Sequence, residues 1–124
     1  MYYPMTMEVV DESDTVAVRF SIDNRSSLLS VEDIDTVIER LVRLRADLQP
    51  PHPAKPLAAH DYPLQVDPCW QVEMSPMFDG PVLLLRHAGT GWIAYMLPAA
   101  SVARLIEVLA AKTPLAVPAD TLVN

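Results

Sequence analysis

One short stretch of the chain gathers side chains that could perform chemistry. The segment HDYPLQVDPCWQVEMS, residues 60–75, contains His60, Asp67 and Cys69, and Cys69 is the only cysteine of the chain. A cysteine becomes a nucleophile when a nearby base and a polar environment stabilise its thiolate. His60 and Asp67 are the residue types that could form such a Cys-His-Asp set, which would make this segment a catalytic site.

The same stretch also has a purely structural interpretation. Cysteine is often a small buried hydrophobe, and an Asp-Pro pair such as Asp67-Pro68 is typical of a turn before a strand. We favour this interpretation, in which Cys69 begins a strand and Trp70 faces the core.

A second candidate motif is VLLLRHAGTGW, residues 82–92. It resembles the histidine phosphatase signature, in which a strand ends in Arg-His-Gly or Arg-His-Ala. The resemblance implies that His87 is a phosphorylated nucleophile and Arg86 a phosphate ligand, since an imidazole can attack phosphorus while arginine stabilises the charge. That family also needs a second histidine and a further arginine far downstream in a larger α/β domain. Only Arg104 and no histidine follow here, so we interpret the match as a short motif without its context.

The sequence predicts neither a metal nor a cofactor. Zinc sites usually contain ligands paired at short intervals, such as Cys-x-x-Cys. The ligand types here are far apart: His52, His60, Cys69 and His87. Gly89 and Gly91 separate two strand patterns, whereas phosphate-binding glycines lie between a strand and a helix, so they predict a hairpin turn.

The elements that would position these residues begin with a hairpin. In TVAVRFSID, residues 15–23, apolar and polar residues alternate with a period of two, which predicts a half-buried strand. Residues 7–10 form its expected partner, joined by the polar residues 11–14.

A helix follows. Ser30 is a good N-cap with Asp33 three residues later, and Pro50 and Pro51 end the pattern. One apolar stripe runs along it: Ile34, Val37, Ile38, Leu41, Leu44 and Leu48.

Residues 49–68 contain six prolines and are expected to form an extended connector. Three short strand patterns then follow, at residues 69–74, 81–87 and 91–97, and their spacing predicts an antiparallel meander with 83–85 at its centre.

A second amphipathic helix is expected from Pro98 to Lys112, with Val102, Leu105, Ile106 and Leu109 on one side. Residues 114–124 form an apolar tail that packs on its own domain or on a partner. The whole chain, 1–124, is expected to be one α+β domain without an internal repeat. We predict a two-layer sandwich with a mostly antiparallel sheet of about five strands, ordered β-β-α-β-β-β-α, and both helices on one face.

The amino-acid composition of the chain indicates which classes of partner it can bind. The net charge of -7 and the pI of about 4.7 disfavour binding to nucleic acid or anionic lipid. The one basic cluster, Arg40, Arg43 and Arg45, is spread around its helix. A single cysteine and a start without a secretory leader or spanning segment predict a cytoplasmic protein.

The first hypothesis is therefore a small acidic, non-catalytic domain for protein interaction or assembly, which associates with itself or with a protein partner and is expected to be a homodimer. The alternative is a small enzyme or ligand-binding protein with a pocket near His60, Asp67, Cys69 and His87. The third hypothesis is nucleic-acid binding, which would require Arg19, Arg40 and Arg43 to converge on one face of the protein.

Overall fold

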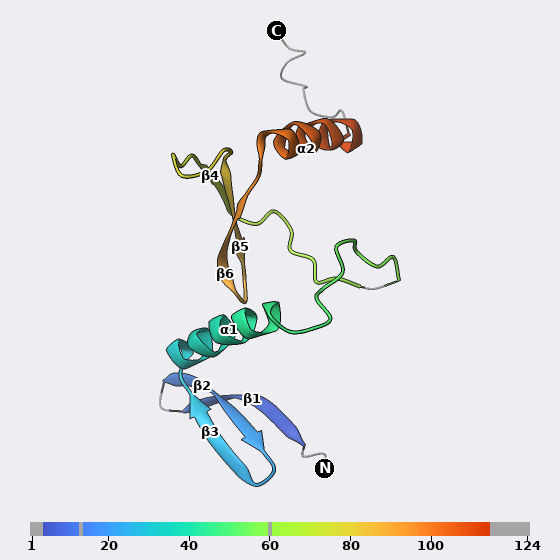
Figure 1. Ribbon diagram of the computed structural model, residues 1–124. Helices are drawn as coiled ribbons and strands as arrows, with labels where there is room; N and C mark the ends of the chain where they lie inside the picture. Colours follow the sequence, from blue (N-terminus) through green and yellow to red (C-terminus); the bar gives the residue numbers. More distant parts are fainter. Residues whose placement is uncertain (1–3, 13, 60, 115–124) are drawn as a thin grey trace. The chain divides into compact units, whose positions relative to one another are not determined.

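The computed structural model describes residues 4–12, 14–59 and 61–114. The chain is divided into two units, Met1–Pro63 and Leu64–Asn124. Each unit contains a three-stranded antiparallel sheet whose last strand leads directly into a helix (Figure 1). The chain is thus α+β, with the same βββα order in both units.

The first unit begins with strands β1 (Met5–Glu12), β2 (Thr15–Ile22) and β3 (Arg25–Leu29), which pair in the order β1-β2-β3 as sheet A. Helix α1 (Val31–Ala46) follows after one residue. The predicted hairpin of β1 and β2 is confirmed, although β1 is longer at both ends than the residues 7–10 that the alternation suggested.

One face of sheet A is apolar. Residues that lie opposite each other in paired strands share a face, and successive residues of a strand alternate between faces. The register places Val18 opposite both Val9 and Leu29. The apolar face of sheet A therefore contains Met5, Met7, Val9, Val16, Val18, Phe20, Ile22 and Leu29, with the polar residues Asp11, Arg25 and Ser27 at its ends and edge.

Helix α1 begins as its sequence predicts. The Ser30 side chain accepts a hydrogen bond from the Asp33 N–H (3.2 Å), and the Ser30 N–H donates to Asp33 Oδ2 (3.0 Å), which completes a capping box. The helix contacts β2 and β3. Ile34 and Ile38 in its first half are half-buried, whereas Leu41 and Leu44 further along are exposed, so only part of the apolar stripe is covered.

The second unit contains β4 (Trp70–Glu73), β5 (Val82–His87) and β6 (Gly91–Met96), paired in the order β4-β5-β6 as sheet B. Helix α2 (Ala99–Lys112) follows. This confirms the predicted meander and the central position of 83–85. The backbone of α2 does not approach that of any strand closely, and its Ile106 side chain is 63% exposed.

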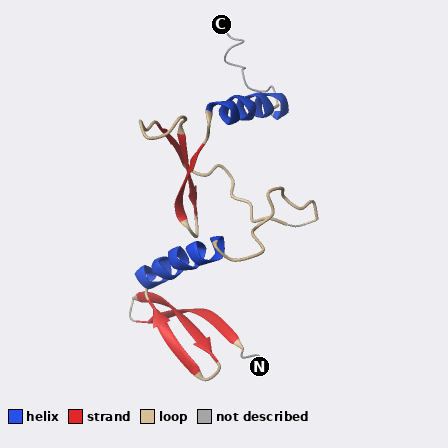
Figure 2. Ribbon diagram, in the orientation of Figure 1, coloured by secondary structure: helices blue, strands red, loops and turns tan. Residues whose placement is uncertain are grey.

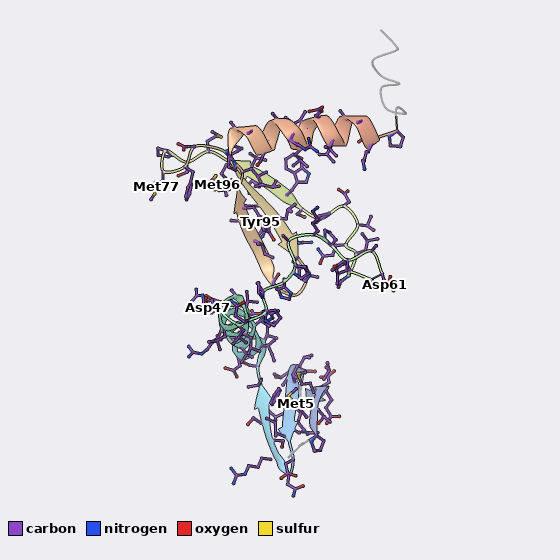
Figure 3. The ribbon with its side chains drawn as sticks, turned by 45° about the vertical axis from the view of Figure 1, so that its right-hand side comes forward. Met5, Asp47, Asp61, Met77, Tyr95 and Met96 are labelled. Atoms are coloured by element: carbon purple, nitrogen blue, oxygen red, sulfur yellow. The ribbon has the colours of Figure 1, made fainter. Side chains whose placement is uncertain are left out.

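Sheet B also has an apolar face. Leu83 lies opposite both Val72 and Tyr95, and Leu85 lies opposite both Trp70 and Ile93. The apolar face of sheet B therefore contains Trp70, Val72, Leu83, Leu85, Ile93 and Tyr95, with His87 and Gly91 at its end. Tyr95 and Met96, labelled in Figure 3, are neighbours on β6 and so belong to opposite faces.

A glycine lets the two ends of this sheet meet. The Leu97 N–H donates a hydrogen bond to the Pro81 carbonyl oxygen (3.0 Å), which joins the start of β5 to the end of β6. Gly80 is buried beside this bond. A Cβ atom at Gly80 would lie 2.0 Å from the Leu97 carbonyl oxygen, so only a residue without a side chain fits.

Residues 47–69 join the two units and contain neither helix nor strand among those described (Figure 2). This agrees with the expected proline-rich connector. The segment turns back on itself, since the Tyr62 hydroxyl accepts a hydrogen bond from the Leu57 N–H (2.8 Å). The Gln49-Pro50 peptide bond is cis.

The predicted sandwich on one sheet of about five strands is wrong, because the strands form two separate three-stranded sheets. Strand β3 was not predicted from the sequence, because its Arg25, Ser26 and Ser27 lack apolar alternation. Without β3, the repeated βββα order was not predicted either. A single domain over 1–124 stays a prediction. His60 and all of the apolar tail beyond Pro114 lie outside the described residues.

Candidate functional site

The structure separates two of the residues considered for catalysis. The Arg86 N–H donates to the Cys69 carbonyl oxygen (3.0 Å), so the pairing of β4 with β5 continues to Cys69. Cys69 therefore shares a face with Arg86, whereas His87, the next residue of β5, belongs to the opposite face. Cys69, Asp67 and His87 are all exposed. The expectation that Trp70 faces a core is wrong, because that side chain is 65% exposed.

His87 has a structural role at the β5–β6 turn. Its Nδ1 atom accepts hydrogen bonds from the N–H groups of Gly89 (3.0 Å) and Thr90 (3.1 Å). Nδ1 is therefore an unprotonated acceptor, and Gly91, with φ of 81°, lets the chain return as β6. The imidazole fixes the turn from which β6 starts.

Replacing His87 by alanine should accelerate amide hydrogen exchange at Gly89 and Thr90 about fivefold, because each loses an acceptor worth about 1 kcal/mol. The Ala88 amide is the internal control, since it donates to the Gln65 side chain instead. His87→Asn, whose side-chain oxygen can also accept bonds from a following turn, should retain most of the protection. Exchange measured by NMR would contradict this role if Gly89 and Thr90 were unchanged in His87→Ala.

A second side chain holds the same turn from the connector. Gln65 Nε2 donates to the Arg86 carbonyl oxygen (3.1 Å), and Gln65 Oε1 accepts from the Ala88 N–H (2.7 Å). These two bonds place residues 65–68 along the end of β5, around a shallow hollow of about 280 Å³ that Asp67 and Arg86 also line. Asp67 adopts a left-handed conformation, with φ of 49°, which aspartate tolerates in bends.

The charged groups that the structure describes form ion pairs but no group that could hold a metal ion. Among residues 4–12, 14–59 and 61–114, no three His, Cys, Asp or Glu side chains come close enough to hold a metal ion. Arg19 pairs with Glu8 across sheet A (2.9 Å), and Arg43 pairs with Glu39 along α1 (2.7 Å). Two of the arginines on which nucleic-acid binding would depend thus have acidic partners.

The most unusual property of both units is the exposure of their apolar side chains. No hydrophobic side chain is buried among the residues described. On the apolar face of sheet A, Met7 is 64% and Val9 is 73% exposed, and on that of sheet B Val72 is 50% exposed. The alternation of apolar and polar residues along the strands predicted these faces, but it does not show what covers them.

A hollow lies beside the β2–β3 hairpin. It has a volume of about 770 Å³ and is lined by Phe20 and Ile22 together with the polar residues 23–27. Phe20 and Ile22 belong to the apolar face of sheet A, so the hollow is a continuation of that face. The charged residues among its lining are Asp23 and Arg25.

Comparison with protein-family models, with curated proteins and with solved structures finds no match to this chain. None of the helices in the described part of the chain is long and apolar enough to span a bilayer. The exposed apolar faces and the edges of the two sheets are therefore the features of the described residues that can indicate a function.

Proposed function

We propose that this chain is a non-catalytic interaction module that assembles with a second copy of itself, which covers its apolar faces. One observation carries the proposal: both sheets present an apolar face, while no hydrophobic side chain among those described is buried. Ordering a residue costs about 1–2 kcal/mol of backbone entropy, which is normally offset by burial of apolar area. A sequence that is 51% hydrophobic has that area available.

The chemistry of the faces favours an apolar partner over a charged one. The acidic side chains give the chain its net charge of -7, but the apolar face of sheet B contains no charged residue. A basic protein or ligand would find no acidic side chain on this face with which to form an ion pair. A second copy offers the same uncharged surface, and two-fold dimers are the commonest assemblies of soluble proteins.

The arrangement of possible reactive groups supports the same proposal. Cys69 and His87 belong to opposite faces of sheet B, and the His87 Nδ1 atom already accepts two turn N–H groups. Catalysis by a Cys-His pair requires the two side chains to lie within hydrogen-bonding reach. An interaction module has no such requirement.

Light scattering coupled to size-exclusion chromatography tests the proposal directly. At micromolar concentration the purified chain should have a mass twice the 13.7 kDa of one copy, or a higher even multiple. A folded chain with the mass of a single copy over the whole concentration range would overturn the proposal.

A further inference from the structure

The four edge strands of the two sheets differ in how well they are protected. β1, β3, β4 and β6 each have one neighbour only. An edge strand presents unpaired N–H and C=O groups that can pair with another chain, unless charge, proline or shortness prevents it. Which edge lacks such protection indicates where a second copy can pair.

Three of the edges are protected. β1 contains three acidic residues, Glu8, Asp11 and Glu12, so two copies side by side would repel each other. β3 has five residues and starts with a charged arginine. β4 has four residues and ends in Glu73.

β6 differs from the other three edge strands because it contains no charged residue. Its sequence, GWIAYM, contains no charge and no proline. Its starting point is also fixed, because the His87 and Gln65 side chains hold the turn before it. Two copies of β6 can approach without electrostatic repulsion.

The hydrogen bonds of sheet B show which groups of β6 are available. In an antiparallel pair, hydrogen-bonded positions alternate along the strand with positions whose N–H and C=O point away. Leu97 bonds to Pro81, and the same register then makes Tyr95 with Leu83 and Ile93 with Leu85 the bonded pairs. The N–H and C=O groups of Trp92, Ala94 and Met96 consequently point toward the free edge.

We infer that β6 is the seam of the assembly, where it pairs antiparallel with β6 of a second copy and Ala94 faces Ala94 across a two-fold axis. This inference rests on the proposed self-association. In this register Trp92 faces the second copy's Met96 and Met96 faces its Trp92, so every outward N–H and C=O of the strand is used. Shifting the strands by two residues would leave some of them unpaired.

The side chains agree with this register. Ala94 at the axis is small, so the two backbones meet without a clash. Ile93 and the second copy's Tyr95 become direct neighbours at a non-hydrogen-bonded position, where side chains approach closely and a β-branched residue packs well against an aromatic ring. The pairing also joins the apolar faces of both copies of sheet B into one surface but does not cover it. A second such pair packed face to face covers it, which gives the higher even multiple of the chain's mass.

A disulfide tests the register. Paired residues at a hydrogen-bonded position have Cα atoms about 5.5 Å apart, which a disulfide can bridge. In a Cys69→Ser background, Ala94→Cys should form a covalent dimer almost completely under mild oxidation. Val9→Cys in the same background is the matched control, because Val9 points its N–H to the free edge of β1, and it should stay largely uncrosslinked.

A proline tests whether the pairing supports the assembly. The Ala94 N–H points away from β5 toward the free edge of the described sheet, so Ala94→Pro removes only the intermolecular bond and an edge strand tolerates it. It should raise the dissociation constant at least about a hundredfold with the circular dichroism spectrum unchanged, whereas Val9→Pro at the β1 edge should not.

The outcomes separate the two proposals. If the wild-type chain is a dimer, but the Ala94→Cys variant does not crosslink and the Ala94→Pro variant keeps the wild-type dissociation constant, the β6 seam is overturned and self-association stays intact. A wild-type chain that is a monomer would overturn both. Crosslinking at Val9→Cys instead would place the seam on β1.

Discussion

Replacing Gly80 by alanine is expected to lower the free energy of unfolding of the sheet B unit by about 3 kcal/mol. A Cβ atom at this position would lie 2.0 Å from the Leu97 carbonyl oxygen and 3.2 Å from Pro98 Cα. Both are backbone atoms, so no flexible side chain can move to relieve the overlap. The start of β5 and the end of β6 would have to separate, which breaks the bond from Leu97 to Pro81.

Gly89→Ala is the matched control. The nearest atom to a Cβ there is His87 Cε1 at 3.4 Å, an ordinary contact, so its effect should stay within about 0.5 kcal/mol. Urea unfolding followed by tryptophan fluorescence measures both variants, because the two tryptophans, Trp70 and Trp92, both belong to sheet B. Equal midpoints for the two variants would show that Gly80 is not tightly enclosed in solution.

Gly80 also shows what local patterns can and cannot predict. The strand patterns on either side of it were found from alternation, and the helix from Ser30 onward from its cap and its apolar stripe. These signals arise from neighbouring residues, so the sequence contains them locally. The close approach of Gly80 to Leu97 depends on how two strands pair at their ends, which no local pattern specifies.

The missed strand β3 has a similar explanation. Its two serines do not alternate in hydropathy, and its pairing depends on the two-residue loop of Asp23 and Asn24 after β2. Asp23 adopts φ of 56°, which a short hairpin loop favours. Polar turn residues directly after an apolar strand were a usable signal, and giving them weight would have predicted a three-stranded sheet.

The candidate site was only partly predictable. The hairpin turn predicted at Gly89 and Gly91, directly after His87, agrees with the structure, because glycines between two strand patterns are a local feature. The Gln65 bonds to the same turn had no signal, since Gln65 is 21 residues from Arg86 along the chain. Exposure of the apolar faces could not be predicted either, because alternation marks an apolar face without identifying what covers it.

Lysine in place of Val72 is expected to disrupt the assembly far more than lysine in place of its neighbour Gln71. Both residues are exposed on β4, but they belong to opposite faces, and only Val72 is part of the apolar face of sheet B. In a unit that stays alone in water, both substitutions should change stability by no more than about 0.5 kcal/mol. The two therefore differ only if something covers the apolar face.

If a second copy covers that face, Val72→Lys buries an ammonium group without a partner. The cost should be about 3 kcal/mol, which raises the dissociation constant more than about a hundredfold. Sedimentation velocity over a dilution series measures this constant for the wild type and both variants. Equal dissociation constants for Val72→Lys and Gln71→Lys would contradict the covering of this face, whereas a loss confined to Val72→Lys would identify it as part of the interface.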